Sequence, residues 1–329
     1  MKNTMKKAIC FVLSAVMLVA LCACGGAGEK SSGKTFSIGL VQYGEHGSLD
    51  NCRLGFLQGL ADAGLTEGTD FIVDYQNAGF DDNINTQIAA SFSANNVDLM
   101  CAIATPSAVA CFTAAEDKDI PVIFTAISDP VQAGLDEGNI TGTSDALPVE
   151  AQLELIRALQ PEAETIGIVY TTSEANSVST IASYQEKAGD YGFTIEALGV
   201  TAQAEVTQAV DTLLSKGVDC LSNLTDNNVV GVLSAILEKT NDAGVPVYGS
   251  EVEQVKLGCV ASAGIDYFRL GVQTGKMAAR ILRGEAKCSD IPYETIEEYG
   301  IYVNSEALAD MGIELPDSVA EKAVEAAEA

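Results

Sequence analysis

The 329-residue chain has no tryptophan and a single histidine, His46. One imidazole cannot build a metal site of several histidines, and a Ser-His-Asp triad would need it beside a reactive serine. No Gly-x-Ser-x-Gly elbow is present to supply that serine. The sequence also lacks a Gly-x-x-x-x-Gly-Lys-Ser/Thr loop and a Gly-x-Gly-x-x-Gly motif, the usual marks of nucleotide hydrolysis and dinucleotide binding. We therefore expect a protein that is not an enzyme and that holds no metal or other cofactor.

Basic residues are also scarce. The chain has 18 lysines and arginines against 46 aspartates and glutamates, which gives a formal net charge of −28. A surface this acidic repels phosphate backbones, so we expect no binding to nucleic acid. The missing tryptophan makes a sugar ligand less favoured without excluding it, because sugar sites often stack rings on aromatic side chains.

The N-terminus has the pattern of an export segment. Three lysines, at positions 2, 6 and 7, precede an apolar stretch at 9–21 that is too short to span a bilayer comfortably. Ala23 and Cys24 then resemble a bacterial lipobox, which predicts a signal peptide at 1–23, lipidation of the Cys24 thiol and attachment to the outer face of the cell membrane. Residues 24–35 are predicted to be a flexible tether. The alternative is an ordinary signal peptide with incidental cysteines.

The six cysteines beyond the lipobox show no paired Cys-x-x-Cys spacing and no zinc pattern. They are Cys52, Cys101, Cys111, Cys220, Cys259 and Cys288. Three of them stand inside apolar, strand-like runs. We expect these residues to be small buried hydrophobes rather than redox or metal groups.

From residue 36 onward the pattern alternates between short apolar strands and amphipathic helices. The predicted strands are 36–41, 71–75, 97–104, 120–124, 140–144, 165–170, 193–198, 218–224, 245–248, 259–263 and 298–303. The predicted helices are 49–63, 83–94, 106–116, 149–159, 177–191, 206–214, 229–241 and 266–283. Residues 318–329 are expected to form an acidic helix or a frayed end. Short central strands with little alternation indicate an α/β fold with parallel sheets covered on both faces.

An internal echo indicates two similar α/β lobes. Val97-Asp98-Leu99 opens a strand that ends at Thr105, and Val218-Asp219-Cys220 opens one that ends at Thr225. In each half a helix follows, and then a strand that contains a proline.

Polar side chains follow many of these strands at the point where each strand ends. In open parallel sheets, ligands bind beyond the carboxyl ends of the strands, where helix N-termini present free N–H groups. The candidate ligand-binding residues from the first half are Gln42, Glu45, His46, Thr105, Ser107, Thr125, Ser128 and Asp129. Those from the rest of the chain are Tyr170, Glu174, Asn176, Ser177, Asp226, Asn227, Asp266 and Tyr267.

These side chains suit a small zwitterion. Thr105, Ser107 and Thr125 could bind a carboxylate, and Asp226 or Glu45 could bind an ammonium group. The aromatic rings that could pack on a ligand side chain are Tyr43, His46, Tyr170 and Tyr267. Each residue also has a simpler interpretation, since threonine, serine and aspartate are common helix N-caps, Asp129-Pro130 suits a turn, and His46 suits a loop.

Taken in order, several stretches between about 36 and 290 are similar to one known family. They are Glu45-His46 with Leu49-Asp50 and Arg53-x-Gly55-Phe56, Thr105-Pro106-Ser107-Ala108, Ile120-Pro121-Val122-Ile123-Phe124-Thr125-Ala126, Ser128-Asp129-Pro130 with Ala133-Gly134-Leu135, Asn139-x-Thr141-Gly142, Tyr170-x-x-x-Glu174-x-Asn176-Ser177, Thr225-Asp226-Asn227 and Gly264-Ile265-Asp266-Tyr267. The family is the ABC-transporter substrate-binding proteins of the TrpX type, within the type I periplasmic-binding fold.

This resemblance implies two Rossmann-like lobes with parallel central sheets, joined by a three-strand hinge. One lobe would hold 36–144 plus 260–290 and the other 147–257 plus 295–329. The resemblance also implies a monomer that captures an aromatic amino acid between the lobes and delivers it to an ABC permease and its ATPase. The alternatives are a sensor for a membrane receptor, or a binder of another metabolite such as a nucleoside or a sugar.

Overall fold

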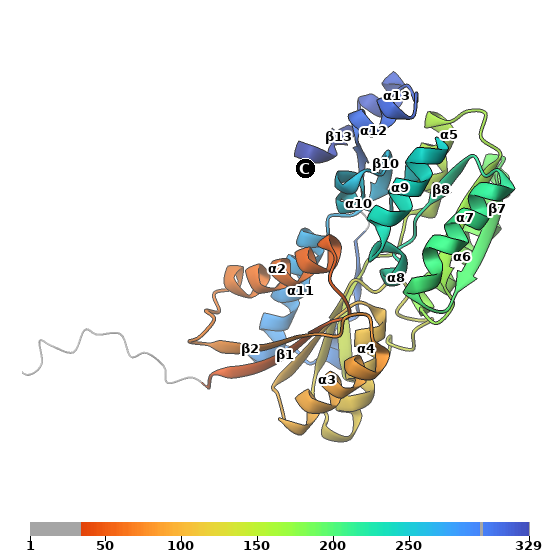
Figure 1. Cartoon of the computed structure of the whole chain (residues 1–329). Helices are drawn as coiled ribbons and strands as arrows, with labels where there is room; N and C mark the ends of the chain where they lie inside the picture. The colour runs from red at the N-terminus through yellow and green to blue at the C-terminus, as the bar shows by residue number, and fades with distance from the viewer. Residues whose placement is uncertain (1–33, 297–298, 329) are drawn as a thin grey trace, which may run out of the picture. The chain divides into compact units, whose positions relative to one another are not determined.

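The computed structural model describes residues 34–296 and 299–328. The predicted signal peptide, the Cys24 lipidation site and most of the tether lie outside the described residues. Phe36–Ala329 form one unit (Figure 1). Within the described residues, no helix combines the length and the apolar character that crossing a bilayer requires.

The first sheet has six strands in the order β11-β5-β4-β3-β1-β2, and every neighbouring pair is parallel. Its strands are β1 (Phe36–Gln42), β2 (Phe71–Asn77), β3 (Leu99–Ile103), β4 (Val122–Thr125), β5 (Ile140–Ser144) and β11 (Glu294–Thr295). The order places β1 and β3 side by side, as in a doubly wound sheet.

The second sheet has seven strands in the order β13-β12-β10-β9-β8-β6-β7. Its strands are β6 (Thr165–Thr171), β7 (Thr194–Val200), β8 (Cys220–Ser222), β9 (Val247–Tyr248), β10 (Ala261–Gly264), β12 (Gly300–Val303) and β13 (Ala323–Glu325). The β10–β12 pair is antiparallel, and the other pairs are parallel.

Helices cover both faces of each sheet. Those of the first are α2 (Gly47–Asp62), α3 (Asp82–Ala94), α4 (Thr105–Ala115) and α11 (Tyr267–Leu282), with the 3-10 turns η1 (Glu116–Lys118) and η4 (Cys288–Asp290). Those of the second are α5 (Val149–Leu159), α6 (Ala175–Lys187), α7 (Val206–Lys216), α8 (Asn227–Val230), α9 (Leu233–Ala243), α10 (Val252–Leu257), α12 (Ser305–Asp310) and α13 (Asp317–Ala320), with η2 (Ala188–Tyr191), η3 (Gln203–Glu205) and η5 (Ala326–Glu328).

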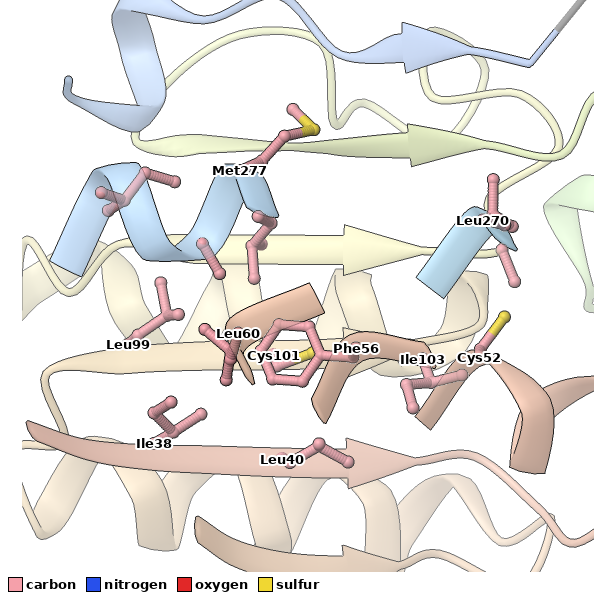
Figure 2. Packing of buried hydrophobic residues seen from close by; sticks show 14 of the residues in the cluster. Ile38, Leu40, Cys52, Phe56, Leu60, Leu99, Cys101, Ile103, Leu270 and Met277 are labelled. Atoms are coloured by element: carbon pink, nitrogen blue, oxygen red, sulfur yellow. The ribbon is translucent and has the colours of Figure 1, made fainter. Parts of the chain in front are cut away.

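The side chains of strand β3 pack into two hydrophobic clusters, one on each face of the first sheet. Leu99, Cys101 and Ile103 pack with α2 and α11 on one face (Figure 2), whereas Met100 and Ala102 pack with α3 and α4 on the other. Because side chains alternate across a strand, a continuous apolar run fills both faces. All six described cysteines are buried and unpaired, which confirms that they pack as small hydrophobes.

The chain passes between the two sheets three times. Residues 145–148 connect β5 to α5, residues 265–266 connect β10 to α11, and the stretch between β11 and β12 makes the third passage. Two α/β sheets joined in this way confirm the predicted two-lobed fold with its three-strand hinge.

Strand membership differs from the predicted lobe boundaries in two places. β10 belongs to the second sheet, although 260 was predicted to begin the return to the first lobe. β11 pairs with β5 in the first sheet, although 295 was predicted to begin the second lobe. β10 and β11 each belong to the sheet that the chain is about to leave. The chain therefore passes to the other lobe a few residues later than predicted.

Two predicted helices are wrong. The tail is helical only at Asp317–Ala320 (α13), and it is not frayed, because Ala323–Glu325 pair with β12 as β13 and Ala326 is buried. Tertiary pairing here overrides the helical preference of an alanine- and glutamate-rich segment. The predicted helix at 229–241 is divided into α8 and α9 at Gly231 and Val232. The short helix α10 was not predicted.

Helices α2 and α11 pack closely because glycines face each other along their contact. A Cβ atom on Gly59 would lie 2.2 Å from the carbonyl oxygen of Val272, and one on Gly275 would lie 2.2 Å from that of Phe56. The obstructing atoms are backbone, so a side chain could be admitted only if the helices moved apart.

We expect Gly59→Ala to lower the free energy of unfolding by about 1–3 kcal/mol, because it overpacks this contact. Gly189→Ala is the matched control, since no atom lies within 4 Å of its added Cβ. Urea unfolding midpoints measure both changes. Equal midpoints for the two variants would contradict the close packing of α2 against α11.

Candidate functional site

The two lobes meet around a small cavity at the carboxyl ends of their strands. Its volume is about 20 Å³. The first sheet and its hinge passages supply His46, Ser48, Leu49, Ala126, Asp145 and Tyr267 to its wall. The second sheet supplies Thr225, Asn227, Val230, Ser250, Glu251 and Gln254. Segments that follow strands of both lobes therefore share one cavity.

Direct hydrogen bonds join the lobes around this cavity. Ser128 Oγ and Thr225 Oγ1 are 2.8 Å apart, and Ser179 Oγ of α6 donates to Asp129 Oδ2 over 2.6 Å. Ser128 and Asp129 follow β4, so these two predicted site residues hold the second lobe against the first.

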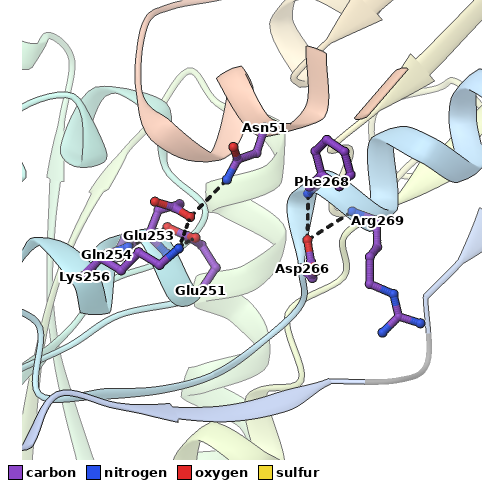
Figure 3. A network of polar contacts seen from close by, with 8 residues as sticks. All are labelled: Asn51, Glu251, Glu253, Gln254, Lys256, Asp266, Phe268 and Arg269. Atoms are coloured by element: carbon purple, nitrogen blue, oxygen red, sulfur yellow. Dashed lines mark hydrogen bonds and ion pairs between the residues drawn. The ribbon is translucent and has the colours of Figure 1, made fainter. Parts of the chain in front are cut away.

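A further contact between the lobes lies outside the cavity. Asn51 of α2 donates through Nδ2 to Glu253 Oε1 of α10 over 3.0 Å, and Lys256 Nζ lies 3.0 Å from the same oxygen (Figure 3). These bonds belong to an arrangement in which the lobes are closed on each other.

Asp145 is a buried carboxyl group in the first hinge passage. Ser128 Oγ donates to its Oδ1 over 2.9 Å, and the Tyr267 hydroxyl donates to its Oδ2 over 2.5 Å. Burial raises the pKa of Asp145 above its usual value, although these two donors favour the carboxylate. The side chain thereby joins three elements of the first lobe at the cavity wall.

Glu251 faces the same cavity from the second lobe. Its carboxyl group caps α10, accepting from the backbone N–H groups of Glu253 and Gln254 over 2.6 and 2.9 Å. A further hydrogen bond comes from the Ser48 side chain at the start of α2. Burial raises the pKa of Glu251 to about 7, against the effect of these donors.

Glu174 is surrounded by amide donors. Its Oε2 accepts from Asn176 Nδ2 and from both nitrogens of Asn227, and its Oε1 accepts from both nitrogens of Asn228. Burial raises the pKa of Glu174 to about 8, and the charge of Asp226 adds to the rise. The loop after β6 is thus tied to the N-terminus of α8 by one carboxyl group.

Asp226 differs from the expectation that it meets a ligand ammonium group. Thr171 donates to it through backbone N–H and hydroxyl at 2.5 and 2.9 Å, Ser177 Oγ at 2.6 Å, and Val229 N–H at 3.0 Å. These donors come from β6, α6 and α8. Asp226 is therefore the N-cap of α8 and a structural junction of the second lobe. Ser177 is one of the donors that satisfy its carboxylate.

His46 stands between the lobes in front of Phe80. Its Nε2 lies 3.4 Å from Asn227 Oδ1, its ring is nearly parallel to that of Phe80 at 6.4 Å, and its buried Nδ1 has no hydrogen-bond partner. Burial lowers the pKa of His46 to about 4, so the ring is neutral at pH 7.

Three predicted residues lie within the first lobe and do not line the cavity. Gln42 donates to Gly44 O and Asp50 Oδ1, Ser107 donates to Asn85 Oδ1, and Thr125 Oγ1 accepts from Thr143. Their polar groups are satisfied by these neighbours, which gives them positions in the fold rather than contacts with the cavity.

Other predicted residues lie apart from it as well. Glu45 is exposed. Asp266 caps α11 by accepting from the N–H groups of Phe268 and Arg269 (Figure 3). Tyr170 packs against the hydrophobic core of the second lobe. Asn176 bridges Glu174 and the Thr225 carbonyl, with its own Oδ1 unpartnered.

Thr105 lines a second, larger depression. This groove of about 500 Å³ runs between α3 and α4 and reaches residues 173–175 of the other lobe. The Oγ1 atom of Thr105 is buried without a partner at its edge. Pro106, Val109 and Ala110 make part of the wall apolar.

Backbone strain marks two of the strand ends. Ala104 after β3 and Ala126 after β4 have φ angles of 81° and 61°, a region that favours glycine. Such conformations persist only where the surrounding structure holds them, and they gather at functional sites. Of the two, Ala126 lines the cavity.

Asp145 and Glu251 were not among the predicted site residues. Asp145 directly follows β5 and Glu251 comes three residues after β9, so the rule applied to the other strands would have found them. No group of three or more histidine, cysteine, aspartate or glutamate side chains suited to a metal occurs within 34–296 and 299–328.

Comparison with known proteins identifies relatives over most of the chain. Residues 37–327 match the family described as ABC transporter substrate binding protein. A tyrosine-binding protein of Clostridioides difficile is 38% identical over 286 residues, which cover 85% of this chain and 82% of that protein.

Solved structures give the same picture. A Streptococcus ABC domain in complex with L-Trp is 33% identical with a TM-score of 0.85, covering 89% of this chain and 99% of that one. A ligand-free, open substrate binding protein from Clostridium difficile is 38% identical with a TM-score of 0.65, covering 88% and 99%. A myo-inositol-bound protein from Bacillus halodurans, 19% identical with a TM-score of 0.62 over 86% and 99%, shares the fold.

The lobes are therefore arranged more as in the L-Trp complex than as in the open, ligand-free relative, although the latter is closer in sequence. The hydrogen bonds between the lobes agree with this closed arrangement.

We expect Asp226→Ala to destabilise the second lobe by about 3 kcal/mol or more, because each buried donor left unsatisfied costs about 1–3 kcal/mol. Thermal and urea unfolding measure the loss. Glu45→Gln is the control, since Glu45 is exposed and should leave stability unchanged. A stable Asp226→Ala variant with wild-type unfolding would show that this carboxylate is not a structural junction.

Proposed function

Because this chain belongs to the ABC transporter substrate-binding proteins, we propose that it captures an aromatic amino acid between its lobes for delivery to an ABC importer. Membership confirms the predicted family and the prediction of a binding protein rather than an enzyme. The tyrosine and L-Trp named for two relatives support the proposed ligand class.

The composition of the cavity wall is the observation that carries this proposal. Asp145 and Glu251 meet there from opposite lobes, and no buried residue in the described part of the chain is a lysine or arginine. A ligand with an ammonium group supplies the missing positive charge, whereas a neutral sugar or nucleoside does not. This favours an amino acid.

Capture requires the lobes to separate. Pockets for small molecules are on the order of 300–1,000 Å³, far more than the space enclosed here. The hydrogen bonds across the cavity, such as Ser128 to Thr225, would break on opening and form again as the lobes close on the ligand. A ligand that contacts both lobes favours the closed state through its contacts there.

Other site residues keep the roles that their positions allow. Thr105 and its buried hydroxyl suit the ligand carboxylate, and the apolar wall of the neighbouring groove suits an aromatic ring. Ser128 and Asp129 hold the lobes closed.

The proposed location rests on the N-terminal sequence. Export through residues 1–23 and lipidation of Cys24 would attach the protein to the outer face of the membrane. There it would present its closed form to the permease, whose ATPase drives import. We propose that it does so as a monomer.

Thermal-shift and calorimetric titrations against the twenty amino acids test the proposal. We expect one or more of L-tyrosine, L-tryptophan and L-phenylalanine to raise the melting temperature, because binding to the folded state alone stabilises it by about 2.7 kcal/mol at one hundred times Kd. Myo-inositol and a nucleoside serve as controls and should cause no shift. Stabilisation by a control ligand and by no amino acid would contradict the assignment.

A further inference from the structure

We propose that His46 Nδ1, Asp145 and Glu251 together bind the ammonium group of the ligand, and that Glu174 acts through Asn227 to make His46 an acceptor. The inference rests on the proposed function and deepens it, because it names the atoms that recognise the amino acid.

The tautomer of His46 follows from a chain of hydrogen bonds. Above its pKa of about 8, Glu174 is a carboxylate, and backbone N–H groups of Asn227 and Asn228 donate to its Oε2 and Oε1. The side-chain atom of Asn227 at 2.7 Å from Glu174 Oε2 is therefore its NH₂ group. This orientation turns Asn227 Oδ1 toward His46 Nε2, 3.4 Å away.

Facing a carbonyl oxygen, His46 Nε2 must carry the proton. In a neutral imidazole the other nitrogen is then an acceptor with a free lone pair. That nitrogen, Nδ1, is buried and has no partner, and His46 lines the cavity. A buried acceptor without a partner costs free energy, which a donor on the ligand would remove.

The chemistry of the wall matches one ligand group. An ammonium ion donates three hydrogen bonds and carries a positive charge. His46 supplies a neutral acceptor, while Asp145 and Glu251 supply carboxyl groups from opposite lobes. Asp145 and Glu251 line the same cavity, and a cation placed between them attracts both carboxylates. Closing of the lobes is thereby coupled to the ammonium group.

Toward His46, Glu174 is a positioning residue in this scheme, since it lies outside the cavity wall and at the edge of the neighbouring groove. In Glu174→Gln, the new amide can donate to Asn227 and reverse its orientation. Asn227 NH₂ would then face His46 Nε2 and favour the tautomer with the proton on Nδ1, which cannot accept from the ligand.

The single histidine makes this tautomer directly observable. In ¹⁵N-labelled protein at pH 9, where Glu174 is ionised, we expect long-range ¹H–¹⁵N spectra to show a protonated Nε2 and an unprotonated Nδ1 in the wild type. Glu174→Gln should shift the population toward protonated Nδ1. A wild-type ring protonated on Nδ1, or identical spectra for the two proteins, would overturn the proposed chain of hydrogen bonds.

Calorimetry with L-tyrosine and with 3-(4-hydroxyphenyl)propanoate, which lacks only the amino group, tests the ammonium assignment. We expect the deaminated compound to bind at least about 30-fold more weakly, since a buried charge loses its partner. His46→Asn keeps an amide oxygen near the place of Nδ1, whereas His46→Gln keeps only a group near Nε2. His46→Gln should therefore weaken L-tyrosine binding by about tenfold or more relative to His46→Asn.

Glu251→Gln should also weaken L-tyrosine binding, and it should bring the Kd values of the two compounds closer together. Glu45→Gln is the exposed control and should bind as the wild type does. If L-tyrosine binds tightly and the deaminated compound binds equally well, the ammonium assignment is wrong and the proposed function survives. If the wild type binds no aromatic amino acid, the proposed function and this assignment of its ligand both fail, whatever the tautomer.

Discussion

Buried carboxyl groups at the junction of the two lobes are the constraint around which the site is organised. No buried lysine or arginine balances them within the described residues, so N–H and O–H donors must do so. Asp226 and Glu174 obtain their donors from the chain itself, and in doing so they fix the strand ends of the second lobe. Asp145 and Glu251 retain acceptor capacity at the cavity. Asp226 and Glu174 therefore have structural roles, whereas Asp145 and Glu251 have the proposed ligand-binding roles.

The same constraint links recognition to closure. Asp145 lies in a hinge passage and Glu251 in the opposite lobe, so a cation between them stabilises the closed arrangement more than the open one. Ser128–Thr225, Asp129–Ser179 and Asn51–Glu253 then complete the contact. Within the first lobe, α2 and α11 pack closely through facing glycines.

The sequence predicted the architecture well because its signals are local. Apolar strands and capped helices recur with the periods that a parallel α/β fold requires, and most predicted elements agree with the observed ones within a few residues. The tail was predicted wrongly because its pairing with β12 is a contact between distant parts of the chain. The break between α8 and α9 was missed because Gly231 lies within an otherwise helical apolar pattern.

The site could be predicted only as a region. Of the residues named by the rule that ligands meet strand ends, His46, Asn227 and Tyr267 line the cavity and Ser128 is bonded to Asp145 of its wall. It could not show that Asp226 is satisfied by Thr171 and Ser177, because that depends on three elements meeting in space. Asp145 and Glu251 carry no motif. Both come after strands, so the strand-end rule would have named them, but that they share one cavity wall depends on how the two lobes meet.

Proton release on ligand binding tests the central claim most directly. Burial raises the pKa of Glu251 to about 7, so this group is partly protonated at pH 7. A neighbouring ammonium group favours the carboxylate and lowers that pKa, so binding must expel protons and become tighter as pH rises from 6 to 8. Calorimetry of L-tyrosine at pH 7 in two buffers of different ionisation enthalpy measures the proton count. Net release, lost in Glu251→Gln, is the predicted result, whereas proton uptake or pH-independent affinity without release would contradict the account.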